Sequence, residues 1–352
     1  MNIFELFKTM QEKDASDLHL KPGAVPTLRL QGKLVPLEGF SPPSAREIKA
    51  AFEAITSPEQ QESFKETCEL DFSFQTDFNL RFRVNASLQR GEICLAFRRV
   101  ASQIPSLEDL GLPAICKELA LKKQGLILVT GPTGSGKSTT LASMIQHLNE
   151  RKARRIVTVE DPIEYLYKDK RSFITQRELG ADTRSFAAAA TQALRQDPDV
   201  ILVGEMRDRN TMAACLTAAE TGHLVLSTLH TNNSPQTIDR LVDTFPPHQQ
   251  KQIRMQLSLT LQAVLAQRLL PRLDGKKRVM VMEIMLANHA IRNLIREGKT
   301  HQMLNVIQTN MKQGMQTLEH SLYKRYQEGL ISLDTALRNA NDEKALRTRL
   351  GH

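Results

Sequence analysis

Residues 131–138 read GPTGSGKS and fit the pattern G-x-x-x-x-G-K-[ST], which is typical of a phosphate-binding P-loop. The preceding segment, Leu126–Thr130, is apolar and β-branched and predicts a short buried parallel strand. After the motif, apolar residues recur at the spacing of one helical face: Leu141, Met144, Ile145 and Leu148. Strand, glycine loop and helix together are the context that a P-loop requires, so the sequence predicts a nucleoside triphosphate site.

In such a loop the backbone N–H groups point at the phosphates, and the helix N-terminus adds partial positive charge. Lys137 is placed to reach the β- and γ-phosphates, and the Ser138 hydroxyl to bind Mg²⁺. A chance glycine turn with a surface lysine is the weaker interpretation, because both flanks fit. The nucleotide-binding candidates are Gly131, Pro132, Thr133, Gly134, Ser135, Gly136, Lys137, Ser138 and Thr139.

Composition narrows the class of protein. A chain of 352 residues predicts more than one domain. It has no apolar run near the roughly 20 residues of a membrane span, and its N-terminus lacks a secretory signal pattern. The cysteines are scattered without a C-x-x-C pair, which favours a reducing compartment and argues against structural zinc. We therefore expect a cytoplasmic protein.

The formal net charge of +8 is compatible with an acidic partner such as nucleic acid or an anionic membrane face. The alternative is that arginines surround a polyphosphate and cross subunit contacts. Aromatic residues make up only 5% and Trp is absent, which leaves little material for stacking bases. No nucleic acid partner is expected on this ground.

The pattern along the chain predicts an N-terminal α+β domain over residues 1–100 and a linker over 101–113, where prolines and turn formers gather. From 114 to 285, helices and buried strands alternate, which predicts a largely parallel sheet with helices on both faces. Residues 286–352 are helical in pattern. The N-terminal domain should contain helices over 2–11 and 44–64 and strands over 71–74, 80–88 and 92–100. The second should contain strands over 125–130, 155–160, 200–204, 224–229 and 278–284, and helices around 137–149, 183–196, 209–221 and 234–243.

Acidic residues end two of the apolar strands. Glu205 closes the segment DVILVGE, where a carboxylate could accept a proton from an attacking water or hold the Mg²⁺ shell. The strand over 155–160 runs into EDPIE, which holds Glu160 and Glu164 and suits a water-mediated Mg²⁺ site. A solvated acid at a strand end is the alternative for each. Two such strands in one P-loop chain favour the functional interpretation.

Histidines flank the strand over 224–229. His223 precedes it and His230 follows it, so about 23 Å of extended chain separates them and excludes a shared metal. A histidine beside the nucleotide could donate a hydrogen bond to the γ-phosphate, and His223 is the second candidate for such a sensor. An ordinary loop histidine is the alternative, and spacing alone favours it. Arg195, just ahead of DVILVGE, is a further candidate for a phosphate contact.

Arginines gather on strands of the N-terminal domain. Arg81 and Arg83 fall on one face of their strand because side chains alternate, while Phe82 and Val84 point into the core. Arg98 ends the last strand of this domain. Guanidinium groups side by side fit a polyphosphate. The alternative, which the residues alone favour, is the charged wet face of a half-buried sheet.

Taken together, these stretches resemble the secretion-superfamily ATPases, and within them the type IV pilus twitching-motility (retraction) ATPases. GPTGSGKST, VTVEDPIEY (157–165), DPDVILVGEMRD (197–208) and TAAETGHLVLSTLHTN (217–232) match the family's Walker A, Asp box, Walker B and His box. The resemblance runs from ASDLHL (15–20) through RFRVNA (81–86) to GMQTLEHSLY (314–323). It implies an α/β fold, with an N-terminal α+β (PAS-like) domain followed by a RecA-like P-loop ATPase domain and a helical C-terminal region.

The resemblance also implies roles. Glu205 aligns with the catalytic glutamate, Glu160 and Glu164 would order the shell of Mg²⁺, and Ser138 would bind the ion. His230 would sense or stabilise the γ-phosphate of ATP. Family members form hexameric rings. They act on an inner-membrane pilus platform protein, which implies a cytoplasmic protein peripheral at the inner membrane.

In such a ring Arg81, Arg83 and Arg98 would help to close the two domains over ATP. The stretch AIRNLIREGK (290–299) is similar to the family's C-terminal motif and predicts an amphipathic helix with Arg292 and Arg296 outward. The tail over 322–347 is closer to an accessory retraction paralogue, which is also a possible partner. Three alternatives stay open: that paralogue, a RecA-type motor that translocates nucleic acid, and a non-hydrolysing assembly subunit.

Overall fold

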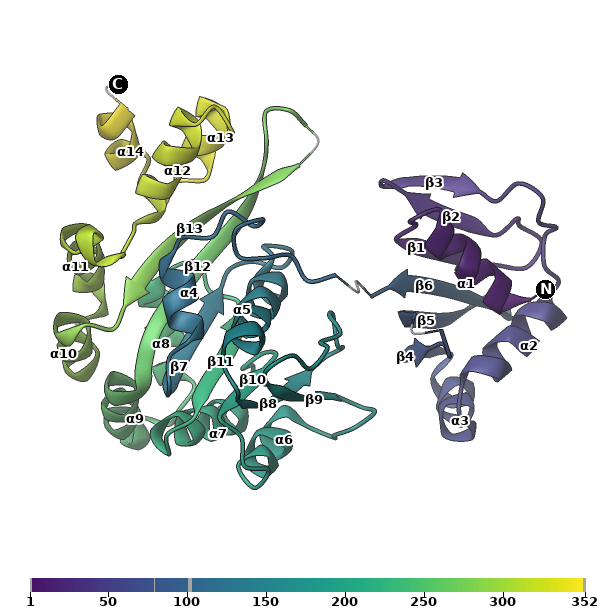
Figure 1. Ribbon diagram of the computed structural model, residues 1–352, viewed down its shortest axis with the longest axis horizontal. Helices are drawn as coiled ribbons and strands as arrows, with labels where there is room; N and C mark the ends of the chain where they lie inside the picture. The colour runs from purple at the N-terminus through teal and green to yellow at the C-terminus, as the bar shows by residue number, and fades with distance from the viewer. Residues whose placement is uncertain (1, 79, 101–102, 276, 351–352) are drawn as a thin grey trace. The chain divides into compact units, whose positions relative to one another are not determined.

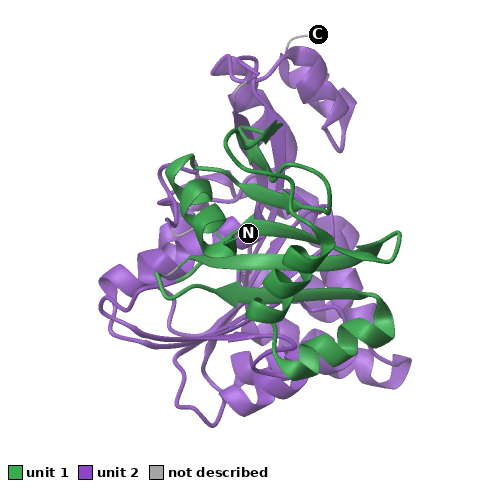
Figure 2. Cartoon of the chain, turned by 90° about the vertical axis from the view of Figure 1, so that its right-hand side faces the viewer, with its two compact units in different colours: residues 1–102, 164–166 green, residues 103–163, 167–352 purple. Residues whose placement is uncertain are grey.

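The computed structural model describes residues 2–78, 80–100, 103–275 and 277–350. The chain divides into two compact units, one of residues 1–102 with 164–166 and one of 103–163 with 167–352 (Figure 2). The expected α/β class is confirmed, because one unit holds an antiparallel sheet and the other a mixed, mainly parallel sheet. Among the described residues, no helix has the length and apolarity needed to cross a membrane.

The first unit is a 6-stranded antiparallel sheet in the order β3-β2-β1-β6-β5-β4, with helices packed on it (Figure 1). Its core is aromatic: the ring of Phe7 stacks on that of Phe82 with centroids 4.4 Å apart, and Phe97 meets Phe7 edge-on at 5.1 Å. The elements are α1 (Ile3–Glu12), β1 (Asp17–Leu20), β2 (Thr27–Leu30), β3 (Lys33–Pro36), α2 (Ala45–Ile55), α3 (Pro58–Thr67), β4 (Glu69–Gln75), β5 (Arg81–Gln89) and β6 (Glu92–Arg99).

The helix expected over 44–64 is two helices. Ser44 caps the N-terminus of α2 in a capping box with Glu47, and Ser57 caps α3 in a second capping box with Gln60. Pro58 is the first residue of α3, where its missing N–H costs no hydrogen bond. The sequence marks this restart, because residues 56–63 read TSPEQQES, with no apolar residue and with the Ser-Pro pair of a new helix start, and the single expected helix was wrong.

The second unit is a 7-stranded sheet in the order β13-β12-β7-β11-β10-β8-β9. Neighbouring strands are parallel except for the β12–β13 pair, which is antiparallel. The strands are β7 (Gly125–Thr130), β8 (Arg155–Glu160), β9 (Phe173–Glu178), β10 (Val200–Val203), β11 (Leu224–Leu229), β12 (Leu261–Pro271) and β13 (Arg278–Leu286).

Helices cover both faces of this sheet, as the alternation of buried residues requires (Figure 1). Ile127 and Val129 of β7 belong to one buried cluster with α4 (Ile115–Ala120) and α5 (Lys137–Arg151). Leu126 and Leu128 belong to the opposite cluster. That cluster includes α6 (Phe186–Ala193), α7 (Arg209–Glu220), α8 (Ser234–Asp243), α9 (Pro247–Thr260), α10 (His289–Glu297) and α11 (Met303–Thr309).

The last helices are α12 (Leu318–Gln327), α13 (Leu333–Arg338) and α14 (Glu343–Leu350), and they pack on the ends of β12 and β13. Arg268 of β12 fixes them, because its Nη1 donates to the carbonyl oxygen of Asn339 at 2.6 Å and its Nη2 to Oδ1 of Asn341 at 2.7 Å.

Strands β9 and β12 were not expected from the sequence. β12 starts directly after α9, and it contains a bulge: Leu261 pairs with Leu126 but Ala263 pairs with the next residue, Ile127. The bulge reverses the alternation, so that Leu261 and Ala263 lie in opposite buried clusters.

Candidate nucleotide-binding site

The glycine loop joins β7 to α5 and rests on β12. Gly131 and Gly136 have φ values of 140° and 86°, which L side chains rarely adopt. A Cβ on Gly131 would lie 2.2 Å from the carbonyl oxygen of Gln267, and one on Gly136 would lie 3.2 Å from Cδ1 of Leu269. Glycine is therefore needed here because the loop packs against the β12 backbone and side chains.

Lys137 is buried and its ammonium group lies within the curve of the loop. Its Nζ donates to the carbonyl oxygens of Gly131 at 3.0 Å and Pro132 at 3.1 Å. Ser138 follows on the exposed side of the first turn of α5. A polyphosphate bound in the loop would replace these carbonyl oxygens as the hydrogen-bond partner of the ammonium group. This is the chemistry expected of a P-loop lysine.

The structure brings three of the predicted residues to the same edge of the sheet as the loop. Parallel pairing aligns the carboxyl ends of β7, β8, β10 and β11. Glu160 ends β8, Glu205 follows β10, and His230 follows β11. In open α/β sheets, ligands bind at this carboxyl edge.

Glu205 is the centre of a charged cluster. Its Oε1 accepts a hydrogen bond from Nε of Arg207 at 2.8 Å, and Nε2 of His230 lies 3.2 Å from the same oxygen. The hydrogen bond to Glu205 raises the pKa of Arg207 above its ordinary value. Sequence reasoning missed Arg207, which comes two residues after Glu205 and carries no separate motif signal. The arrangement joins a proton acceptor, an imidazole and a permanent cation.

Glu160 is held by its own strand and by β9. Its Oε1 accepts from the Thr158 hydroxyl at 2.7 Å and from Nε2 of Gln176 at 3.2 Å. Glu164 is exposed and falls in the short segment 164–166 that groups with the first unit.

These residues fit Mg²⁺ in the way it is usually bound in P-loop proteins. Among the described residues there is no group of three or more His, Cys, Asp or Glu side chains that could cage a metal. Mg²⁺ commonly needs no such cage, because phosphates and water complete its shell. The Ser138 hydroxyl and the carboxylates of Glu160 and Glu205 are the oxygen donors at this edge.

His223 and Arg195 lie at the other edge of the sheet. The carbonyl oxygen of His223 accepts from the N–H of Gly125, the first residue of β7, so a whole strand separates it from the loop. Arg195 lies in the segment that enters β10 at its amino end. Within one chain, neither is brought to the P-loop, and the interpretation of His223 as a γ-phosphate sensor gains no support from this geometry.

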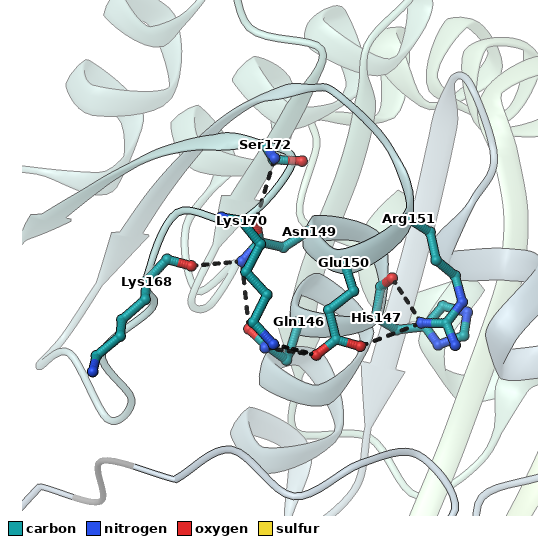
Figure 3. Close-up of polar contacts among 8 residues, drawn as sticks. All are labelled: Gln146, His147, Asn149, Glu150, Arg151, Lys168, Lys170 and Ser172. Atoms are coloured by element: carbon teal, nitrogen blue, oxygen red, sulfur yellow. Dashed lines mark hydrogen bonds and ion pairs between the residues drawn. The ribbon is translucent and has the colours of Figure 1, made fainter.

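The far end of α5 is fixed by a polar network that the sequence did not reveal (Figure 3). The Asn149 side chain donates from Nδ2 to the carbonyl oxygen of Lys168 at 2.8 Å, and its Oδ1 accepts from the N–H of Lys170 at 3.1 Å. Glu150 pairs with the Lys170 ammonium at 2.6 Å (Figure 3). The helix that begins at the P-loop is therefore held at both ends.

The arginine candidates of the first unit lie on the outer face of its sheet. The expected alternation is confirmed, because Phe82 and Val84 are buried while Arg83 is exposed. Arg83 stands directly opposite Arg98 on the neighbouring strand. Like charges in that position destabilise a sheet.

An acid compensates part of this charge. Asp17 is buried, and its Oδ1 accepts from Nε of Arg98 at 2.8 Å. Burial opposes ionisation of Asp17, but hydrogen bonds from Ser16 and Arg98 outweigh it and hold the pKa of Asp17 below its ordinary value. Asp17 thus keeps one guanidinium oriented on the face that also carries Arg81 and Arg83.

Arg292 is not outward, contrary to the expectation for the helix at 290–299. It donates from Nε to the carbonyl oxygen of Ala287 at 2.7 Å, and from Nη1 and Nη2 to three carbonyl oxygens at the end of α9: Ser258 at 2.6 Å, Leu259 at 2.7 Å and Leu261 at 3.0 Å. Burial lowers its pKa from the ordinary value. The amphipathic pattern identified Ile291, Leu294 and Ile295 correctly as buried.

Comparison with known proteins places the chain in a family. Residues 66–338 match the family model of type II/IV secretion system proteins. The type IV pilus retraction ATPase PilT of Pseudomonas aeruginosa is 45% identical over 340 residues, which cover 97% of this chain and 98% of the relative. The type IV pilus ATPase PilU of the same organism is 40% identical over 347 residues, covering 99% and 91%.

A solved structure agrees with these relatives. The crystal structure of the pilus retraction motor PilT with bound ADP superposes with a TM-score of 0.92 and 47% sequence identity, covering 99% of both chains. The chain therefore belongs to the type II/IV secretion system protein family, and within it is similar to the type IV pilus ATPases PilT and PilU.

Proposed function

We propose that this chain is an ATP-hydrolysing motor that drives type IV pilus retraction, and hence twitching motility, as a hexameric ring. The observation that carries the proposal is the convergence of Lys137, Glu160 and Glu205 at one edge of a parallel sheet. Membership of the secretion ATPase family, with identity along nearly the whole chain to a pilus retraction ATPase, supports the mechanical output.

The residues divide the chemistry among themselves. Lys137 and the loop N–H groups bind the phosphates, and the Ser138 hydroxyl would hold Mg²⁺, which would neutralise charge at the phosphates. Glu205 accepts the proton of the attacking water. His230, whose Nε2 lies 3.2 Å from the same carboxylate, would turn that nitrogen to the γ-phosphate when ATP is bound. Glu160 and Glu164 would help to hold the ion through water.

The ring gives the arginines of the first unit a partner. Arg83 and Arg98 repel each other across the sheet, and a polyphosphate between subunits would relieve that repulsion. We propose that Arg81, Arg83 and Arg98 close over ATP and that Arg195 contacts phosphate from a neighbouring subunit. A head-to-tail interface either closes into a ring or forms a filament. The ring would act in the cytoplasm on a platform protein of the inner membrane.

Two substitutions test the chemistry. Glu205→Gln should lower kcat by roughly 10²–10⁴-fold, the range of general acid–base catalysis, and leave ATP affinity nearly unchanged. Lys137→Ala should weaken both, because it removes a direct phosphate contact. Glu150→Gln is the matched control, since that carboxylate pairs with Lys170 at the far end of α5. A Glu205→Gln variant with most of its kcat would transfer the role of base to Glu160 or Glu164.

A second candidate is the accessory retraction ATPase, which the tail over 322–347 favours. Deletion of the gene decides between them: hyperpiliated cells that do not twitch indicate the principal motor, and cells that still retract pili indicate the accessory one. A nucleic-acid motor, suggested by the net charge of +8, would show ATPase stimulation by DNA that persists at high salt.

A further inference from the structure

Gln267 of β12 is fully buried, and both the nitrogen and the oxygen of its side-chain amide form hydrogen bonds to the glycine loop and the start of α5. Its Nε2 donates to the carbonyl oxygen of Ser135 at 2.7 Å, and its Oε1 accepts from the Thr140 hydroxyl at 2.9 Å. Ser135 lies inside the glycine loop and Thr140 in the first turns of α5. One side chain therefore joins the loop to the helix that follows it.

The same residue also limits the space beneath the loop. Its carbonyl oxygen is the atom that a Cβ on Gly131 would meet at 2.2 Å, and its Nε2 would be 3.4 Å from a Cβ on Gly136. The loop thus touches Gln267 near its start, in its middle and at its end. A buried amide needs hydrogen-bond partners, and Gln267 finds them in the segment that holds the glycine loop.

The direction of the Ser135 hydrogen bond has a chemical consequence. Where the N–H of a peptide unit points inward at phosphate, the carbonyl oxygen of the same unit points away, because the two groups lie on opposite sides of the planar trans peptide bond. Nε2 of Gln267 holds the Ser135 carbonyl on the side of β12. Without that donor the carbonyl loses its partner in a buried place, and turning toward the phosphate site is its route to another donor.

We propose that Gln267 is a positioning residue for nucleotide binding: it holds the P-loop in the shape that presents N–H groups to phosphate. The proposal rests on the proposed nucleotide binding. Gln267 touches no phosphate itself, so its loss should weaken nucleotide affinity through the loop and change kcat less than affinity.

The test compares Gln267→Met with Gln316→Met in the full-length chain. Gln316 is the matched control, because its Nε2 also donates to a main-chain carbonyl oxygen at 2.7 Å, but that of Met282 in β13, which lies beyond β12 from the P-loop strand. The probe is ADP with Mg²⁺, followed by calorimetry, with thermal unfolding measured in the absence of nucleotide. Gln267→Met should raise Kd about tenfold or more, which is about 1.4 kcal/mol. Gln316→Met should lower the unfolding temperature comparably and leave Kd within about twofold.

A second variant guards against misfolding. Thr140→Val keeps the shape and removes only the hydroxyl, and it should raise Kd by a smaller factor that does not multiply with that of Gln267→Met in the double variant. The proposal is overturned if Gln267→Met binds as tightly as the wild type, or if Gln316→Met weakens binding equally. A wild-type chain that binds no nucleotide overturns the proposed function and this inference together. Wild-type binding with an unaffected Gln267→Met overturns the inference alone.

Discussion

Replacing Arg292 by alanine should destabilise the second unit strongly. The guanidinium donates to four main-chain carbonyl oxygens, three of them at the end of α9. Hydrogen bonds to charged groups contribute about 1.5–3 kcal/mol each. In the variant, water would hydrogen-bond to some of these carbonyl oxygens and so recover part of the lost free energy. The favourable charge at the helix C-terminus is lost as well. We expect a loss of about 2–4 kcal/mol in the free energy of unfolding.

Arg296 is the matched control on the same helix. It is exposed, and its Nη2 donates to the side chain of Asn293 only three residues before it. Arg296→Ala should change stability by about 0.5 kcal/mol or less. Thermal unfolding of the full chain, followed by circular dichroism, should show a Tm lower by roughly 5–12 °C for Arg292→Ala and little change for Arg296→Ala.

Arg292→Lys refines the measurement. An ammonium group cannot span the carbonyls that the planar guanidinium reaches, so lysine should recover less than half of the lost stability. Equal melting temperatures for Arg292→Ala and Arg296→Ala would refute the argument. Arg292 would then be a surface residue of the C-terminal motif, available to a partner, and the carbonyl contacts would carry no net stability.

Three further outcomes are expected. Arg81→Ala combined with Arg83→Ala should lower the ATPase rate roughly 10²-fold, which is the scale expected when a charge partner of the transition state is lost, and should change nucleotide affinity much less. A rate near that of the wild type would contradict the interdomain mechanism. Gly131→Ala should abolish nucleotide binding in a filter assay, because its Cβ would lie 2.2 Å from a β12 carbonyl oxygen. Gly134→Ala is the control, because its Cβ would meet nothing within 4 Å and the substitution costs only about 1–2 kcal/mol of backbone strain. Asp17→Asn should lower stability to urea at pH 7, and the deficit should vanish as the pH falls below 3.8: the folded pKa is depressed, so the carboxylate stabilises above its ordinary pKa and this contribution is lost on protonation. A deficit that is constant with pH would exclude the charge as its cause.

The parts of the fold that the sequence predicted best are those set by local pattern. The strands over 125–130, 155–160 and 224–229 have the expected bounds, because each is a short apolar run that ends at turn residues or charges. Their common carboxyl edge then follows from parallel pairing alone. The positions of Glu160 and His230 at the same edge of the sheet as the P-loop were predictable for that reason.

Strands that depend on tertiary pairing were missed. Residues 261–270 continue the apolar spacing of α9 without a glycine or proline, and they form β12 because they pair with β7 on one side and β13 on the other. The strand over 173–178 reads FITQRE and has little apolar alternation to reveal it. Pairing partners far away in the chain, rather than local propensity, decide both.

The supporting side chains of the site were beyond reach for the same reason. Gln267 contacts a residue 132 positions away in the sequence, so no motif joins the two. Arg292 shows the converse limit: its position on an amphipathic helix predicted exposure, but the end of α9 lies beside it and supplies free carbonyls. A periodic pattern describes one helix and cannot report what packs against it.

The bulge in β12 restricts how the length of this chain can vary. Because the bulge reverses the alternation after Leu261, it decides that Gln267 faces the glycine loop and Arg268 faces the C-terminal helices. Deleting one residue between the bulge and Gln267 would exchange the two faces and bring a guanidinium toward the loop. Insertions and deletions should therefore survive in the turn between β12 and β13, or in pairs within the strand. The length of the connection between β12 and β13 can therefore vary, while the number of residues between the bulge and Gln267 can change only by an even number.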